Sequence, residues 1–253
     1  MTEEVLVEIA DGVIEVTINR PEARNAMSKA AAEGISAAMD RLEAEPDLRC
    51  AILTGAGGTF CSGMDLKGFL AGEHPIVPGR GFGGLTDWTP KKPVIAAVDG
   101  FALAGGFELA LACDMIAANV NARFGVPEVK RGLVAGGGGV VQLPRLLPRP
   151  LAMELALTGD TITAQRAFDL GLVNRVTDGP AIEAARELAR TIAENGPLAV
   201  IASKGIVRDS WLWSAEEMMA KQMPYIAHVF SSEDAREGAM AFAQKRKPEW
   251  KGK

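Results

Sequence analysis

Residues 105–113 read Gly-Gly-Phe-Glu-Leu-Ala-Leu-Ala-Cys, a segment in which one carboxylate stands among apolar side chains. The glycine pair can open a helix, and such a helix has almost no polar face to turn towards water. Because burying an ionised carboxylate without a partner is costly, Glu108 should either be paired or line a cavity that uses it. The alternative is a half-exposed helix with Glu108 reaching solvent, for which the flanking residues provide little polar surface.

A short apolar block precedes this segment. Residues 93–100 read Pro-Val-Ile-Ala-Ala-Val-Asp-Gly, which predicts a buried strand that ends at an Asp-Gly turn. Free backbone N–H groups at the start of the following helix favour negative charge, so Gly105 could donate to a developing oxyanion. The junction therefore combines a candidate anion site with the candidate carboxylate Glu108.

A second strand runs into glycine further upstream. Residues 50–55 form an apolar block closed by glycine, and residues 60–67 place Gly63 just before an expected helix start. Two such junctions can supply two converging N–H donors. Ordinary tight turns explain most glycines in α/β proteins, and the spacing alone favours that simpler interpretation.

The second candidate carboxylate is Glu128, which follows Pro127 between apolar residues. Four consecutive glycines, residues 136–139, come shortly after it and let the backbone approach a ligand closely. Glu128 on its own is a weak signal, because it could pair with Lys130 or Arg131 at the surface.

Five stretches in sequence order resemble the crotonase superfamily, also called the enoyl-CoA hydratase/isomerase family. They are residues 19–26, 60–67, 93–114, 124–139 and 157–176. The resemblance runs along nearly the whole chain and implies an α/β fold with a crotonase-like ββα spiral core. Residues 1–195 would form this core with an acyl-CoA site, and residues 196–253 would form a C-terminal helical region for trimerisation.

The resemblance also implies roles for particular residues. In hydratases of this family, two glutamates at the positions of Glu108 and Glu128 hold a water at the double bond of an α,β-unsaturated acyl-CoA. We assign Glu128 as the proton donor to carbon 2 and Glu108 as the group that orients and deprotonates water. Backbone N–H groups at the positions of Met64 and Gly105 would form the oxyanion hole. The implied positions for CoA and substrate binding are Arg24, Ala26, Ser62, Asp65, Leu66, Lys67, Pro127 and Gly136.

The expected function is that of an enoyl-CoA hydratase, a hydro-lyase that needs no metal and no cofactor, since CoA is part of the substrate. The alternatives are a Δ3-Δ2 enoyl-CoA isomerase, which can operate with one carboxylate, and a crotonobetainyl-CoA hydratase-like enzyme. A third class is an RNA-binding homologue. The formal net charge of −5 and the lack of a basic, aromatic-interleaved patch in the sequence speak against nucleic acid as a partner.

Composition sets wider limits. A chain of 253 residues that is 48% hydrophobic and 23% charged is ordinary for a globular protein with a large core. Its three cysteines have no CxxC spacing and its two histidines are far apart, which predicts buried thiols in a reducing compartment and no metal site. We find no basic, apolar leader and no apolar run of membrane-spanning length, so we expect a cytoplasmic protein without membrane attachment.

Periodicity predicts alternating strands and helices, followed by a purely helical region. Strands are expected near residues 4–9, 13–19, 50–54, 93–98, 114–119 and 172–176, with a helix near 28–44 and helices throughout from about 181. A capping box, Ser214 to Glu217, should start a helix whose apolar stripe is Met219, Met223, Ile226 and Phe230. This stripe reads either as core packing or, through the resemblance, as contacts in a homotrimer or a dimer of trimers.

Residues 71–89 are rich in glycine and proline. Residues 79–84 match GxGxxG, but no strand precedes them and no helix clearly follows, so we reject a dinucleotide site. In the family that it resembles, this region varies and covers the acyl pocket. Phe82 or Trp88 would then either shape substrate choice or anchor a mobile loop.

Overall fold

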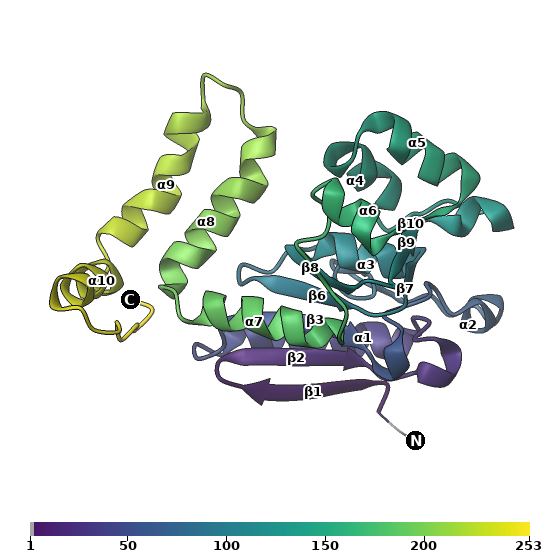
Figure 1. Cartoon of the computed structure of the whole chain (residues 1–253), viewed down its shortest axis with the longest axis horizontal. Helices are drawn as coiled ribbons and strands as arrows, with labels where there is room; N and C mark the ends of the chain where they lie inside the picture. Colours follow the sequence, from purple (N-terminus) through teal and green to yellow (C-terminus); the bar gives the residue numbers. More distant parts are fainter. Residues whose placement is uncertain (1–2) are drawn as a thin grey trace.

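The computed structural model describes residues 3–253 and has a six-stranded sheet at its centre (Figure 1). The strands lie in the order β1-β2-β3-β6-β8-β11; β1 pairs with β2 antiparallel and the other pairs are parallel. Their bounds are Val5–Ala10, Val13–Ile18, Cys50–Gly55, Val94–Val98, Met115–Asn119 and Arg175–Thr177. The central strands β3 and β6 are covered on both faces, which explains why they are continuous apolar runs instead of alternating ones.

A second, three-stranded sheet gives the fold its repeat. It consists of β7 (Phe101–Leu103), β9 (Arg123–Gly125) and β10 (Thr161–Thr163) in the order β10-β9-β7. Strand β6 is followed by β7 and then by helix α3 (Gly105–Ala112), and β8 is followed by β9 and the 3-10 helix η3 (Pro127–Arg131). The chain thus winds through strand, strand and helix in successive turns, which confirms the expected ββα spiral core.

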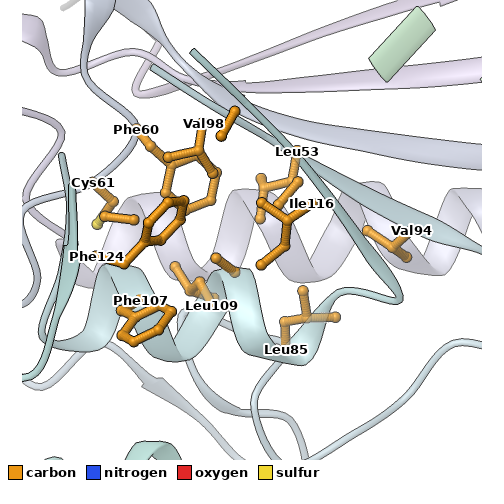
Figure 2. Close-up of a cluster of buried hydrophobic side chains, with 14 of the residues drawn as sticks. Leu53, Phe60, Cys61, Leu85, Val94, Val98, Phe107, Leu109, Ile116 and Phe124 are labelled. Atoms are coloured by element: carbon orange, nitrogen blue, oxygen red, sulfur yellow. The ribbon is translucent and has the colours of Figure 1, made fainter. Parts of the chain in front are cut away.

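Helices cover the two faces of the large sheet. On one face, α1 (Lys29–Ala44) and α3 pack into the main core, where Phe60, Phe107 and Phe124 are fully buried (Figure 2). On the other face lies α7 (Ala181–Ala193), whose alanines pack against the opposite side chains of the same strands. Because successive strand residues point to opposite faces, neighbours in β3 belong to different clusters.

Shorter elements complete the spiral. The helices are α2 (Leu66–Leu70), α4 (Gly139–Leu146), α5 (Arg149–Thr158) and α6 (Ala164–Asp169), with the 3-10 turns η1 (Pro21–Ala23) and η2 (Ala56–Gly58). Strands β4 (Ile76–Val77) and β5 (Gly81–Phe82) form a small antiparallel hairpin. Among residues 3–253, no helix combines the length and the apolar character that crossing a bilayer requires.

The C-terminal helices extend away from the sheet (Figure 1). They are α8 (Pro197–Asp209), the 3-10 turn η4 (Ser210–Leu212), α9 (Met218–Phe230) and α10 (Glu233–Gln244). Of the hydrophobic residues that are buried in the described chain, only Ala241 lies beyond Ala189. Helices α8 and α9 approach closely at Gly205, where an added Cβ would lie 2.6 Å from the Tyr225 ring. This region therefore has little core of its own.

Two sequence-based boundaries were wrong. Helix α9 begins at Met218 instead of at Ser214, because the Ser214 hydroxyl donates to the Glu217 carboxylate (2.9 Å) and does not cap a backbone amide. The last strand of the sheet begins at Arg175, since the amides of Leu172 and Val173 turn back to the carbonyl of Ala167 at the end of α6. The other predicted strands agree with the structure to within one or two residues.

Candidate active site

A cavity of about 540 Å³ lies where the starts of α2, α3 and α4 approach one another. Its walls combine apolar side chains, glycine backbone and a small number of charged groups. The lining residues are Arg24, Ser62, Met64, Leu66, Ile76, Gly81, Phe82, Asp87, Leu103, Ala104, Gly105, Glu108, Pro127, Glu128, Arg131, Leu133, Val134, Gly136 and Gly137. This composition is typical of a small-molecule site, which is mostly apolar with a few placed polar groups.

Glu108 lies on the first turn of α3 and is only 4% exposed. Its Oε1 accepts a 2.8 Å hydrogen bond from the backbone N–H of Gly139. Burial raises the pKa of this carboxyl, while the amides of Gly139 and Gly137 act in the opposite direction. The sequence offered two choices for Glu108, pairing or lining a cavity, and the structure shows both at once.

The glycine run is shaped around that carboxylate. A Cβ at Gly137 would lie 2.7 Å from Oε2 of Glu108, and one at Gly139 would lie 3.1 Å from Oε1. Larger residues at either position would push the carboxylate away. Two of the four glycines, Gly137 and Gly139, approach Glu108, and Gly136 and Gly137 also line the cavity, so the expected close approach of this backbone to a ligand stays a prediction.

Glu128 lies in η3, on the other side of the cavity, and is half-buried. Its Oε2 is buried and has no hydrogen-bond partner among residues 3–253. Burial, together with the negative charge of Glu108, raises the pKa of Glu128 to about 7, although its own backbone amide and Arg131 oppose the rise. The two glutamates therefore share a cavity but differ in environment, because Glu108 accepts the amide of Gly139 from the start of α4, whereas Oε2 of Glu128 has no partner among residues 3–253.

Met64 and Gly105, the two predicted oxyanion positions, both line the same cavity. Gly63 packs directly against Ala104, with an added Cβ only 2.8 Å from the Ala104 Cβ, so the two segments are in contact. Met27 occupies the backbone groups on either side of Met64: its N–H donates to the carbonyl of Gly63, and its carbonyl accepts from the N–H of Asp65. The N–H groups of Met64 and Gly105 themselves form no hydrogen bond with residues 3–253. Both donors are thus available to a ligand.

The backbone at this junction is unusual. Ala104 has a φ of 53°, a conformation that non-glycine residues adopt only when the surroundings enforce it. Gly105 follows at the first position of α3, and a Cβ there would lie 2.3 Å from the ring of Phe82. A larger residue at position 105 would require the Phe82 ring to move away from the helix start.

Most of the predicted substrate-binding positions line the cavity, namely Arg24, Ser62, Leu66, Pro127 and Gly136. Three others lie outside it. Asp65 caps α2 through the amides of Lys67 and Gly68 and forms a 2.9 Å ion pair with Arg20. The carbonyl of Ala26 accepts from the Arg20 guanidinium, and the Lys67 side chain is exposed on α2. Asp65 and Ala26 thus hold the loop that carries Arg24.

Phe82 and Trp88, the two aromatic residues of the hairpin region, lie in different surroundings. Phe82 lines the cavity and contacts Gly105, so it shapes the pocket wall. Trp88 is half-buried against the core and has the Arg80 guanidinium 3.4 Å from its ring centroid, so it anchors the segment. Both interpretations were open for either residue; Phe82 lies in the cavity wall and Trp88 packs against the core, while an influence on substrate choice stays a prediction.

The sequence analysis missed Asp87, a third carboxylate in the cavity wall. It also missed Arg131 as a lining residue and the direct contact of Gly137 and Gly139 with Glu108. A carboxylate directly before an aromatic residue in a glycine-rich segment carries no distinctive pattern, and only the folding of the hairpin brings it to the site. Within residues 3–253, no group of three or more His, Cys, Asp or Glu side chains lies close enough together to hold a metal ion.

Comparisons with known proteins agree with this architecture. The enoyl-CoA hydratase/isomerase family matches residues 8–253. The chain is 44% identical to the carnitinyl-CoA dehydratase of Proteus mirabilis over 250 residues, which is 95% of each chain. The crystal structure of an enoyl-CoA hydratase from Mycobacterium tuberculosis superposes with a TM-score of 0.97 at 55% identity, covering 100% of both chains. A carnitinyl-CoA hydratase from Mycobacterium avium gives a TM-score of 0.79 at 43% identity, again over 100% of both chains. The chain therefore belongs to the enoyl-CoA hydratase/isomerase family.

Proposed function

We propose that the protein is an enoyl-CoA hydratase, a hydro-lyase that adds water across the 2,3 double bond of an enoyl-CoA thioester. The observation that carries this proposal is the pairing of two differently held carboxylates, Glu108 and Glu128, with two free N–H donors in one cavity. Close relatives that carry the names enoyl-CoA hydratase and carnitinyl-CoA dehydratase support it.

The environments of the glutamates suggest how they divide the proton transfers. Glu128, with its pKa raised to about 7, keeps a substantial protonated fraction near neutral pH and is suited to give a proton to carbon 2. Glu108 accepts the amide of Gly139, a contact that favours its ionised form and suits it to take a proton from water. The water oxygen then bonds to carbon 3, and no group beyond these residues and the CoA thioester is needed.

The thioester oxygen gains negative charge as water adds to carbon 3. We place this oxygen between the N–H groups of Met64 and Gly105, whose segments are held together by the contact of Gly63 with Ala104. Donors that are already oriented stabilise the enolate-like transition state without reorganising, and one such donor is typically worth roughly 3 kcal/mol. The strained φ of Ala104 helps to aim the second donor.

The CoA part of the substrate would enter past Arg24 and Ser62, which lie at one side of the cavity. We propose that Arg24 meets a CoA phosphate. Lys67, exposed on α2 three residues from the oxyanion donor Met64, could bind a second phosphate. Ala26 and Asp65 would serve CoA binding indirectly, because their contacts with Arg20 support the loop that carries Arg24.

We also propose that residues 196–253 assemble the protein into a homotrimer or a dimer of trimers. Helix α9 has no buried residue in the isolated chain, and on its surface Met219 is 67% exposed and Phe230 is 79% exposed. Apolar area of this kind usually meets a partner. The core formed by residues 1–195 would then carry the acyl-CoA site, with the helical region serving oligomerisation.

A panel of enoyl-CoA thioesters tests the function. Purified protein should consume 2-enoyl-CoA substrates, seen as loss of the absorbance of the conjugated enoyl group, and yield the 3-hydroxy product. If 3-enoyl-CoA thioesters were converted faster, and only the Glu128→Gln variant lost activity, the protein would be an isomerase. No turnover of any member of the panel would refute the proposal.

A further inference from the structure

Arg20 carries a largely buried charge behind the wall of the cavity, and its side chain is only 15% exposed. The guanidinium engages three acceptors. Nη2 forms a 2.9 Å ion pair with Oδ2 of Asp65, Nη1 donates to the carbonyl of Ala26, and Nε lies 3.2 Å from Oε1 of Glu4. Burial alone would raise the pKa of Asp65, but the Arg20 guanidinium and two backbone amides of α2 hold it below its usual value. The ion pair therefore stays charged near neutral pH.

Two of these acceptors adjoin the backbone bridge between Met27 and Met64, since Ala26 precedes Met27 and Asp65 follows Met64. The N–H of Met27 donates to the carbonyl just before Met64 (2.7 Å), and its carbonyl accepts from the N–H of Asp65 (3.0 Å). In a parallel bridge, this pattern turns the N–H of Met64 itself away from Met27. Arg20 thus links the two backbone segments whose pairing sets the direction of that N–H.

The loop that carries Arg20 is itself fixed to the core. Asn25 is fully buried, and its Oδ1 accepts the backbone N–H of Arg20 (2.9 Å) while its amide donates to the carbonyl of Ala56 (2.8 Å). Arg24 and Asn25 have φ values of 52° and 54°, which non-glycine residues keep only where the surroundings enforce them. Because this loop is held in place, the guanidinium fixes the position of the Met64 segment relative to the core.

We propose that Arg20 is a positioning residue for the oxyanion hole, holding Ala26 and Asp65 together so that the N–H of Met64 points at the thioester oxygen. The inference rests on the proposed function, since it concerns one of the two donors that would stabilise the enolate-like transition state. Arg20 does not line the cavity, so its effect passes through the backbone at Met64. A misdirected donor loses much of its effect on a developing charge, whereas the apolar contacts that bind the acyl group remain.

The carbonyl stretching frequency of a bound thioester reports the direction of the donor. Butanoyl-CoA is saturated, so it occupies the site without reacting, and the infrared difference between compound labelled with ¹³C at the thioester carbon and unlabelled compound isolates its carbonyl band. Donors at the oxygen weaken the C=O bond, so binding to the wild-type protein should lower the frequency. Arg20→Met keeps an apolar stem and removes the charge, and about half of this shift should be lost because one of two donors is misdirected.

The kinetics should separate in the same way. Arg20→Met should lower kcat roughly 10- to 100-fold while the dissociation constant of butanoyl-CoA stays within about threefold of the wild-type value. Arg20→Lys keeps a charge but lacks the fork that reaches two acceptors, so its carbonyl shift and kcat should lie between those of Arg20→Met and the wild type. Asp65→Asn keeps an oxygen for the α2 cap and should lose part of the shift. The double variant should be no worse than Arg20→Met alone, because both residues act through one contact.

Arg186→Met is the matched control. It removes a bidentate ion pair with Glu15 (2.7 and 2.6 Å) that joins α7 to the sheet and has no part in the cavity wall. The carbonyl band and kcat of this variant should equal those of the wild type. An equal effect of Arg186→Met and Arg20→Met would mean that any lost ion pair disturbs the site, which contradicts a specific role of Arg20.

Three further results would overturn the inference: no frequency change when the wild-type protein binds the thioester, a full wild-type shift in Arg20→Met, or losses of kcat that multiply in the double variant. A full shift together with a lower melting temperature would mean that Arg20 only stabilises the fold. If Arg20→Met does not fold, Asp65→Asn decides by the same infrared measurement. Because butanoyl-CoA needs no turnover, a protein that polarises its carbonyl through Arg20 but hydrates no enoyl-CoA would refute the proposed function and leave this inference intact.

Discussion

The backbone N–H of Gly139 donates a 2.8 Å hydrogen bond to Oε1 of the buried Glu108 carboxylate. Gly139 is the first residue of α4, and Glu108 lies on the first turn of α3, 31 residues earlier in the chain. The contact therefore links the two helix starts and fixes the direction of a carboxylate that would otherwise be buried without a partner. It also predicts that substitutions at the neighbouring glycines will disturb Glu108 to different degrees.

The glycine run should tolerate a methyl group at one position and not at another. Gly137→Ala places a Cβ 2.7 Å from Oε2 of Glu108, so the carboxylate must shift and kcat should fall roughly 10- to 100-fold. Gly136→Ala is the matched control, because its Cβ would meet only the Val134 carbonyl at 3.8 Å. Its kcat should stay within about threefold of the wild-type value, and if the substitution has an effect, the effect should be on KM. Equal losses in both variants would contradict the proposed support of Glu108.

Removing the charge from either glutamate should stop the reaction without stopping binding. Glu108→Gln and Glu128→Gln should each lower kcat by roughly 10² to 10⁴ while affinity for a saturated acyl-CoA remains. Steady-state assays with crotonyl-CoA measure the loss of kcat, and calorimetric titration with a saturated acyl-CoA measures the affinity separately. Near-normal hydration by either variant would remove that residue from the mechanism.

The rate should depend on pH in a direction set by the two carboxyl groups. As proton donor, Glu128 must be protonated, so kcat/KM should fall as the pH rises through the value of about 7 to which its pKa is raised. As base, Glu108 must be ionised, so the rate should also fall on the acid side, at a pH above the ordinary titration of glutamate because burial raises its pKa. Since the two carboxyl groups interact, the two apparent pKa values of the pH–rate profile describe the pair and not either residue alone. A kcat/KM that rises steadily from pH 6 to pH 9 (roughly the range that brackets the pKa of Glu128) would reverse the assignment of the donor.

The oxyanion donors can be tested through proline, which lacks an N–H. Met64→Ala keeps the donor and should alter the fit of the acyl group modestly, whereas Met64→Pro removes it and should lower kcat by about 10² to 10³. Each variant must first show the circular dichroism and the oligomer mass of the wild type. A folded Met64→Pro enzyme with undiminished hydration would mean that another group holds the thioester oxygen.

The exposed apolar surface of α9 predicts the mass of the protein in solution. Light scattering at micromolar concentration should give three or six chains of 26.7 kDa each. Replacing Met223, which is 52% exposed on α9, by lysine should shift this mass towards the monomer, because a charge in an apolar interface is costly. A wild-type mass equal to one chain would refute the proposed assembly.

Local pattern was sufficient for much of the fold. The apolar runs of β3 and β6 were readable because a buried parallel strand must be apolar throughout. One error, the start of α9, fell where a side chain had two possible partners. Ser214 looked like a helix cap, but its hydroxyl binds the Glu217 carboxylate, and the sequence does not reveal which acceptor wins.

By itself, the sequence determined the alternating strands and helices and singled out Glu108, because one carboxylate in an apolar helix leaves few alternatives. The spiral core and the candidate role of Glu128 came from the resemblance to a known family, since Glu128 alone was a weak signal. Only the tertiary structure decided what surrounds the two glutamates. The amide of Gly139 reaches Glu108, the Oε2 of Glu128 stays unpaired, and Asp87 joins the cavity from a hairpin that carries no recognisable motif. These relationships join residues 20 or more positions apart, and the protonation state of a carboxyl group depends on its burial and its neighbours in space, which the order of residues along the chain does not specify.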